Sequence, residues 1–182
     1  KAITGLMPDT PHLYETLTGR QFVRFIADLY GMDARRSERR MEELLEMFDL
    51  ATAADALIKS YSYGMQKKIL LTAVLVHEPR VLFLDEPTSG LDPKSARTVK
   101  TILRALCHRG CTVFMTTHIL EIAERVCDRI GIINNGKLIA VGTMDELRKS
   151  NTMADVSLED IFLELTGSVG QEDMVRFLID ER

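Results

Sequence analysis

Tryptophan is absent from these 182 residues, and aromatic residues of all kinds make up only 6% of them. No apolar run approaches the roughly 20 residues that a membrane-spanning helix needs, and no secretory signal segment is recognisable. The formal net charge of −4 leaves no basic surface of the kind that binds nucleic acid. We therefore predict no nucleic-acid partner.

Cysteine is also scarce. Cys107, Cys111 and Cys127 are odd in number and lack the spacing of metal ligands, which predicts free thiols in a reducing compartment. The first residue is Lys1 rather than Met, so we expect an initiator to have been lost by processing or truncation. What the chain does contain is a hydrophobic fraction of 46% and a charged fraction of 27%, which suit one folded domain with its own core.

One apolar stretch organises the rest of the sequence. Val81–Leu84 lies between Pro79 and Pro87 and predicts a short strand that is buried on both faces. Two carboxylates, Asp85 and Glu86, follow it directly. Ligands of open α/β sheets bind beyond the carboxyl ends of the strands, so this pair suits a magnesium ligand followed by a base that polarises water. The alternative is a buried strand that ends in a polar turn.

The flanking segments resemble, in order and spacing, the nucleotide-binding domain of ATP-binding cassette (ABC) proteins, from Ile3 to about Gly167. The run Tyr61–Lys68 resembles the signature motif, Val81–Glu86 the Walker B strand, Ser89–Asp92 the D-loop, and His118, after a second apolar strand at Thr112–Thr116, the switch histidine.

The resemblance implies an α/β fold. The implied fold is part of a P-loop NTPase (RecA-like) domain, with a mostly parallel sheet flanked by helices and an inserted ABC helical subdomain. The implied parts are the end of a core strand with the Q-loop (1–11), the helical subdomain with the signature motif (12–78), the RecA-like core with Walker B, D-loop and switch histidine (79–150), and C-terminal helices (151–182).

The Q-loop position holds an aspartate. Asp9 lies in the run Pro8–Pro11, directly after a predicted strand end, where the family has a glutamine that contacts magnesium and water and couples to the membrane partner. An aspartate can still bind magnesium through oxygen, although it is shorter and charged. The alternative is a turn-forming aspartate between two prolines.

The signature-like run precedes a predicted helix at Met65–Val76. Free N–H groups and the dipole at such a helix start favour an anion, and the resemblance implies that Ser62 and Gly64 meet the γ-phosphate held by the opposite protomer. Tyr61, Tyr63 and Met65 replace the leucine, first glycine and glutamine of the usual Leu-Ser-Gly-Gly-Gln, and the form Tyr-Ser-x-Gly-Met is similar to exporter-type members. The resemblance places Tyr63 and Met65 at the nucleotide too. The alternative is an ordinary helix start after a serine-rich turn.

Capping and turn residues place the other elements. The predicted helices run from Thr18 to Gly31, from about Ser37 to Phe48, from Asp92 to about Cys107, from Thr143 to Lys149 and from Ser157 to Gly167, with a short tail helix after Ser168. The first two resemble the family's helical subdomain, which docks on membrane subunits.

Gly131–Lys137 matches the phosphate-loop pattern G-x-x-x-x-G-K, but the pattern is misleading here. The next residue is Leu138 instead of the Ser or Thr whose hydroxyl binds magnesium. Asn135-Gly136 is a strong two-residue turn signal between Ile130–Asn134 and Lys137–Val141, so we predict a β-hairpin.

The resemblance implies an ATP-binding and ATP-hydrolysing subunit of an ABC transporter that couples hydrolysis to export, with ATP and Mg²⁺ as cofactors. Under this interpretation Asp85 binds magnesium directly or through water, Glu86 polarises the attacking water, and His118 contacts the γ-phosphate. Asp92 bridges two protomers. The implied partners are a transmembrane permease subunit and a second nucleotide-binding domain, in a homo- or heterodimer, on the cytoplasmic face of the cell membrane.

A true Walker A motif and the adenine-stacking aromatic residue of the family are not identifiable. The resemblance implies that both lie upstream of Lys1, so that the chain corresponds to the C-terminal two-thirds of such a domain. Its phosphate-loop strand is expected between the remaining strands, so Val81–Leu84 and Thr112–Thr116 are each expected to expose an edge. Two alternatives stay open: a non-transport ABC ATPase of translation or DNA repair, and a non-hydrolysing interaction module.

We predict that a polypeptide of these 182 residues binds MgATP weakly or not at all. A phosphate loop supplies a concave array of backbone N–H groups to the phosphates, and the sequence contains none. Isothermal calorimetry measures the affinity directly. A micromolar dissociation constant would contradict the prediction.

Overall fold

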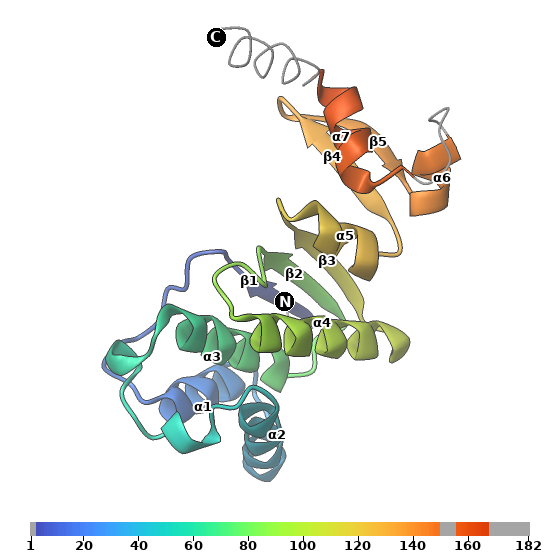
Figure 1. Cartoon of the computed structure of the whole chain (residues 1–182). Coiled ribbons are helices and arrows are strands. Elements are labelled where there is room, and N and C mark those ends of the chain that lie inside the picture. The colour runs from blue at the N-terminus through green and yellow to red at the C-terminus, as the bar shows by residue number, and fades with distance from the viewer. Residues whose placement is uncertain (1–2, 150–155, 168–182) are drawn as a thin grey trace, which may run out of the picture. The chain divides into compact units, whose positions relative to one another are not determined.

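The computed structural model describes residues 3–149 and 156–167. The chain forms two compact units, Lys1–Thr117 and His118–Arg182, whose elements are labelled in Figure 1. Each unit has a hydrophobic core of its own.

The first unit contains a parallel sheet of three strands in the order β1-β2-β3. β1 spans Thr4–Met7, β2 spans Val81–Asp85 and β3 spans Thr112–Thr116. Parallel neighbours need long crossover connections, which are usually helical. Three α-helices lie between β1 and β2, and α4 (Pro93–His108) lies between β2 and β3. All three strands therefore end at the same edge of the sheet.

The three helices between β1 and β2 form a layer of their own (Figure 1). α1 (Gly19–Leu29), α2 (Ala34–Met47) and α3 (Tyr63–Val76) contact one another, and α3 also contacts β1. Two short 3-10 helices, Ala51–Ala53 and Ile58–Ser60, connect α2 to α3. Apolar residues of these helices, of α4 and of the sheet form one continuous core, so the helical layer and the sheet are a single packed body.

One face of this sheet is packed and the other is exposed. Leu82 and Leu84 are buried in the core that α3 and α4 share. The outward side chains of the three strands are Leu6 (69% exposed), Phe83 (43%) and Phe114 (62%), which lie in register. The prediction that Val81–Leu84 is buried on both faces is wrong at Phe83. Side chains alternate along a strand, so helices on one face leave every second residue outside.

The edges of the sheet differ from expectation in one respect. β2 pairs with β1 on one side and with β3 on the other, so it is the central strand and has no free edge. The expectation that Val81–Leu84 exposes an edge is therefore wrong. β3 lies at one end of the strand order, as expected for Thr112–Thr116.

Helix ends follow the local signals in the sequence. Thr18 and Gln21 form the predicted capping box at the start of α1, and Asp92 caps α4 by accepting a hydrogen bond from the Ser95 N–H. α2 begins three residues earlier than predicted, at Ala34, because the Asp33 carboxylate accepts a hydrogen bond from the Arg36 N–H at 3.0 Å. The predicted boundary at Ser37 was therefore wrong.

Within residues 118–149 and 156–167, the second unit contains a hairpin and three helices. Its elements are α5 (Leu120–Val126), β4 (Ile130–Asn134), β5 (Lys137–Gly142), α6 (Met144–Lys149) and α7 (Leu158–Thr166). Asn135 and Gly136 have φ values of 50° and 74°, so both turn residues are left-handed, as a tight hairpin turn requires. This confirms the predicted hairpin at the phosphate-loop-like pattern. The tail helix predicted after Ser168 lies outside the described residues.

The predicted fold class is confirmed, since the first unit is a parallel sheet with helices packed against it. None of the helices in residues 3–149 and 156–167 has the length and apolar character needed to cross a bilayer.

His77, the residue that ends α3, is half-buried beside the start of β1. Its ring stacks on Tyr30 with centroids 3.7 Å apart, and its Nε2 lies 3.2 Å from the Thr4 carbonyl oxygen. Its Nδ1 is buried and has no hydrogen-bond partner among the described residues. Because only Nε2 faces an acceptor, the neutral ring with a proton on Nε2 fits this place, and burial lowers the pKa of His77 below its ordinary value.

We expect His77 to make the folded protein less stable as the pH falls. Between the ordinary pKa of about 6.5 and the lower folded pKa, the unfolded chain binds a proton that the folded state does not, so the free energy of unfolding decreases. Urea unfolding at about pH 7.5 and at about pH 5.5 measures this decrease on either side of the ordinary histidine pKa. The His77→Phe variant, which keeps a ring beside Tyr30, should show a smaller decrease than the parent, and the exposed His108→Gln variant should match the parent. Equal decreases in the parent and in His77→Phe would contradict this account.

Candidate functional site

Two carboxylates and two hydroxyls meet where β2 and β3 end. In the parallel register Asp85 lies opposite Thr116, whose hydroxyl donates a hydrogen bond to the Asp85 carboxylate. The Thr117 hydroxyl donates to Glu86 Oε2 at 3.2 Å, and the Glu86 N–H donates to the Thr116 carbonyl oxygen at 3.1 Å. The strand register thus brings the Asp-Glu pair and the Thr-Thr pair to one edge of the sheet.

Glu86 has a strained backbone. Its φ of 46° lies in the left-handed region, which costs a residue other than glycine about 1–3 kcal/mol. The conformation is held on both sides of the residue. The Glu86 N–H is bonded to β3, while its carbonyl oxygen accepts hydrogen bonds from Lys67 Nζ at 2.7 Å and from the Ser89 N–H at 3.2 Å. Strain that the surroundings maintain in this way is typical of functional positions.

Lys67, on α3, is the buried cation of this site. Its side chain is 0% exposed, and its Nζ lies 2.9 Å from Asp9 Oδ1 in addition to its bond to Glu86. No role for Lys67 was predicted from the sequence. A signal for its burial was available, though not for its partners, because Lys67 stands at helical spacing from Leu70, Leu71 and Val74, the residues that bury the same face of α3.

The four predicted signature residues lie in the first turn of α3. The Ser62 hydroxyl caps the helix by accepting a hydrogen bond from the Met65 N–H at 3.3 Å. The Tyr63 hydroxyl donates to the Asp9 carbonyl oxygen at 3.3 Å. Gly64 lies beside the loop that follows β2, where a Cβ on Gly64 would be 3.7 Å from the Gly90 carbonyl oxygen. The structure therefore groups Ser62, Tyr63, Gly64 and Met65 with Asp9 and with the D-loop-like segment.

Gly90, in that segment, has no room for a side chain. Its φ is 72°, and a Cβ there would lie 2.6 Å from the Tyr63 ring. Asp92, two residues further on, accepts hydrogen bonds from the Ser95 hydroxyl and the Ser95 N–H, and these bonds lower the pKa of the Asp92 carboxyl. Asp92 is thus a helix cap at an exposed position, and its predicted contact with a second protomer stays a prediction.

His118 is the first residue of the second unit. His118 follows Thr117 in the chain, and the Thr117 side chain is bonded to Glu86. Its predicted contact with a γ-phosphate stays a prediction.

The residues of this edge fit magnesium in a particular way. Within residues 3–149 and 156–167, no group of three His, Cys, Asp or Glu side chains could hold a metal ion. Magnesium seldom uses such a cage, because it keeps several waters and binds one or two carboxylates together with phosphate oxygens. Asp85, exposed at the strand end, suits this mode. Asp9 is paired with Lys67, whose charge opposes a second cation, although the Asp9 side chain is 46% exposed and can still reach a hydrated ion.

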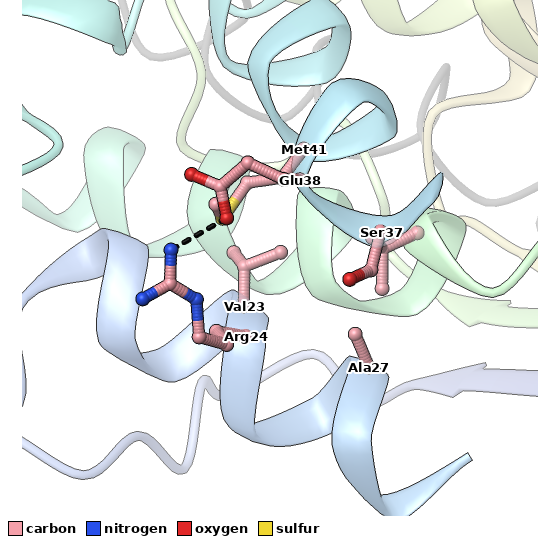
Figure 2. Close-up of a pocket in the computed structure, with 7 residues that line it drawn as sticks. Val23, Arg24, Ala27, Ser37, Glu38 and Met41 are labelled. Atoms are coloured by element: carbon pink, nitrogen blue, oxygen red, sulfur yellow. Dashed lines mark hydrogen bonds and ion pairs between the residues drawn. The ribbon is translucent and has the colours of Figure 1, made fainter. Parts of the chain in front are cut away.

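The pocket drawn in Figure 2 is not a candidate site. It is a shallow depression between α1 and α2 that is lined by Val23, Ala27, Ser37 and Met41, among others, and it has no room for a water molecule. The Arg24 guanidinium and the Glu38 carboxylate form an ion pair across its mouth at 2.5 Å. Val76 of α3 also lines the depression, which is part of the packing among α1, α2 and α3.

A family model described as "AAA domain, putative AbiEii toxin, Type IV TA system" matches residues 25–124. Among curated proteins, the "Daunorubicin resistance ATP-binding protein DrrA3" of Streptomyces coeruleorubidus is 43% identical over 91% of this chain and 52% of its own length. The "ABC-type transporter ATP-binding protein EcsA" of Bacillus subtilis is 36% identical over 88% of this chain and 65% of its own length. The chain spans about half the length of the first curated relatives it matches.

A solved structure gives a similar result. "Structure of ATP binding subunit of ABC transporter" superposes with a TM-score of 0.85 at 33% sequence identity, and the match covers 90% of this chain and 68% of the other. The likeness thus holds in sequence and in fold over most of both chains.

Proposed function

Because this chain belongs to the ATP-binding subunits of ABC transporters, we propose that it takes part in ATP hydrolysis that drives export across a membrane. The observation that carries the proposal is the position of Asp85 and Glu86 at the carboxyl end of β2, the central strand of a parallel sheet. Open α/β folds bind their ligands at this edge.

Asp85 and Glu86 take different roles in this proposal. Asp85, oriented by the Thr116 hydroxyl, holds magnesium directly or through water, and the ion offsets the charge of the nucleotide phosphates. Glu86 accepts a hydrogen bond from the attacking water and so directs its lone pair at the γ-phosphate. The bonds that fix the Glu86 backbone support this role, because phosphoryl transfer depends on positioning and charge stabilisation. Asp9 is a second contact for the hydrated ion, and His118 is a contact for the γ-phosphate.

The first turn of α3 binds a phosphate held by a second nucleotide-binding domain, in a homo- or heterodimer. The N–H groups of Tyr63 and Gly64 have no acceptor within the helix, and the helix dipole favours an anion there. The Ser62 hydroxyl accepts from Met65, which leaves its own hydrogen able to donate to a phosphate oxygen. Asp92 bridges the two protomers in the same arrangement.

The remaining partner is a transmembrane permease subunit. Residues 12–78 are the helical subdomain that docks against it, and residues 1–11 are the Q-loop region. Residues 79–150 are the catalytic core, and residues 151–182 are the C-terminal helices. The protein works at the inner face of the cell membrane. Export is favoured because relatives bear the names "Daunorubicin resistance ATP-binding protein DrrA3" and "Linearmycin resistance ATP-binding protein LnrL".

Replacing Glu86 with Gln in the full-length protein should lower the rate of ATP hydrolysis by on the order of 100-fold or more and leave ATP affinity largely unchanged. The amide keeps the size of the side chain and loses the charge that polarises water. His118→Ala should also slow hydrolysis, by a similar or smaller factor. Steady-state phosphate release and equilibrium nucleotide binding measure the two effects.

Glu78→Gln is the matched control, because Glu78 also has a left-handed φ, of 52°, but pairs with Arg36. It should keep the parent rate. A Glu86→Gln protein that hydrolyses ATP near the parent rate would place the base elsewhere, and an unchanged rate in His118→Ala would make that histidine structural.

Replacing Ser62 with Arg should leave ATP binding by the full-length monomer intact and block ATP-driven dimerisation and hydrolysis. The substituted side chain is bulky and charged at a helix start that the proposal places in the closed dimer interface. Sedimentation of the Glu86→Gln protein with ATP, with and without Ser62→Arg, tests this. Equal dimerisation of the two proteins would rule out the first turn of α3 as a site that acts across the interface.

A further inference from the structure

We propose that Lys67 is a positioning residue for Glu86, and that its buried ammonium group keeps the Glu86 backbone in the left-handed conformation from which the carboxylate reaches the end of β3. The inference rests on the proposed function, because it takes Glu86 as the group that polarises water. It adds a residue on α3 to a site otherwise built from strand ends.

The contacts of Lys67 are those of a buried cation with a specific place to bind. Its Nζ lies 2.7 Å from the Glu86 carbonyl oxygen and 2.9 Å from Asp9 Oδ1, and 5.6 Å from the centre of the Tyr63 ring. Hydrogen bonds from a charged donor are short and strong compared with neutral ones. One ammonium group thus joins the end of β2 to the segment that follows β1.

Packing alone does not account for a lysine at this place. The residues of α3 that share its burial are apolar, from Ile69 through Val76 with the exception of Thr72. Removing an ammonium group from water is costly, and apolar side chains of similar size often stabilise a buried position as well or better. The distinctive effect of Lys67 is on the groups it binds.

The Glu86 backbone needs such a restraint. Its φ of 46° is strained for a glutamate, and the following residue is Pro87, which biases the residue before it toward extended conformations with negative φ. If the bond from Lys67 to the Glu86 carbonyl is lost, the peptide between Glu86 and Pro87 can turn toward that preferred region. The side chain would then leave from a different direction and move away from Thr117, to which it is now bonded at 3.2 Å.

The test uses the full-length protein and the variants Lys67→Met and Lys67→Gln. Methionine fills the volume without a charge, and glutamine keeps a polar head group that is too short to bind both acceptors. We expect both variants to lower kcat by about tenfold or more while KM for ATP stays within about twofold, because a small displacement of a reacting group has a large effect on rate and Glu86 acts on the attacking water. The matched control is Thr72→Val, which changes another buried polar residue of α3, bonded only to the Lys68 carbonyl within the helix, and should keep the parent kcat.

A single-turnover comparison separates positioning from general damage. If Lys67 acts through Glu86, Lys67→Met should lower the rate about tenfold in the parent and less than about twofold in the Glu86→Gln background, where there is no carboxylate to position. An equal loss in both backgrounds, or an unchanged kcat in Lys67→Met or Lys67→Gln, would overturn the inference. A Lys67→Met protein that fails to fold leaves Lys67→Gln to decide the question. If Glu86→Gln itself hydrolyses ATP at the parent rate, the proposed function fails, which is a different result.

Discussion

Parallel pairing on both sides of β2 is the constraint on which the first unit depends. It requires crossovers, and these place α1, α2 and α3 between β1 and β2 and place α4 between β2 and β3. It also fixes where the polar residues lie, because parallel strands end together. Asp85 is opposite Thr116 in this register, and a shift by one residue would turn the Asp85 side chain to the other face of the sheet.

The helical layer is tied to this strand edge by polar contacts at the start of α3. Gly5 shows how close the two layers are, since a Cβ there would lie 2.7 Å from the Val74 side chain. Such packing fixes the distance between α3 and the sheet. Lys67, near the first turn of α3, then contacts the residue that follows β2. The same helix start carries Ser62 and Tyr63 beside Asp9. The Glu86 carbonyl oxygen and the Asp9 carboxylate are therefore both linked through Lys67 to the start of α3.

Much of the fold and part of the site could be predicted because the signals are local. Caps such as Asp92 and turns such as Asn135-Gly136 act within a few residues, so the neighbouring sequence is enough to predict them. The exposure of Phe83 could not be predicted, because an apolar run says nothing of how many faces are covered. The Lys67 contacts were also out of reach, since they join residues 58 and 19 positions apart in the chain. The left-handed φ of Glu86 depends on those same distant contacts, and the residue types next to Glu86 in the sequence do not predict this conformation.

Tyr63 shows how a departure from a family motif can be compatible with the motif's chemistry. A tyrosine in place of glycine at the start of α3 adds a ring where a phosphate is proposed to approach. That ring is held elsewhere, because its hydroxyl donates to the Asp9 carbonyl oxygen and its edge occupies the space that a side chain on Gly90 would need. The first-turn amides depend on backbone conformation, which a residue with a side chain can adopt as readily as glycine in a helix. Glycine is instead favoured at Gly90, where φ is positive and where a Cβ would lie 2.6 Å from the Tyr63 ring.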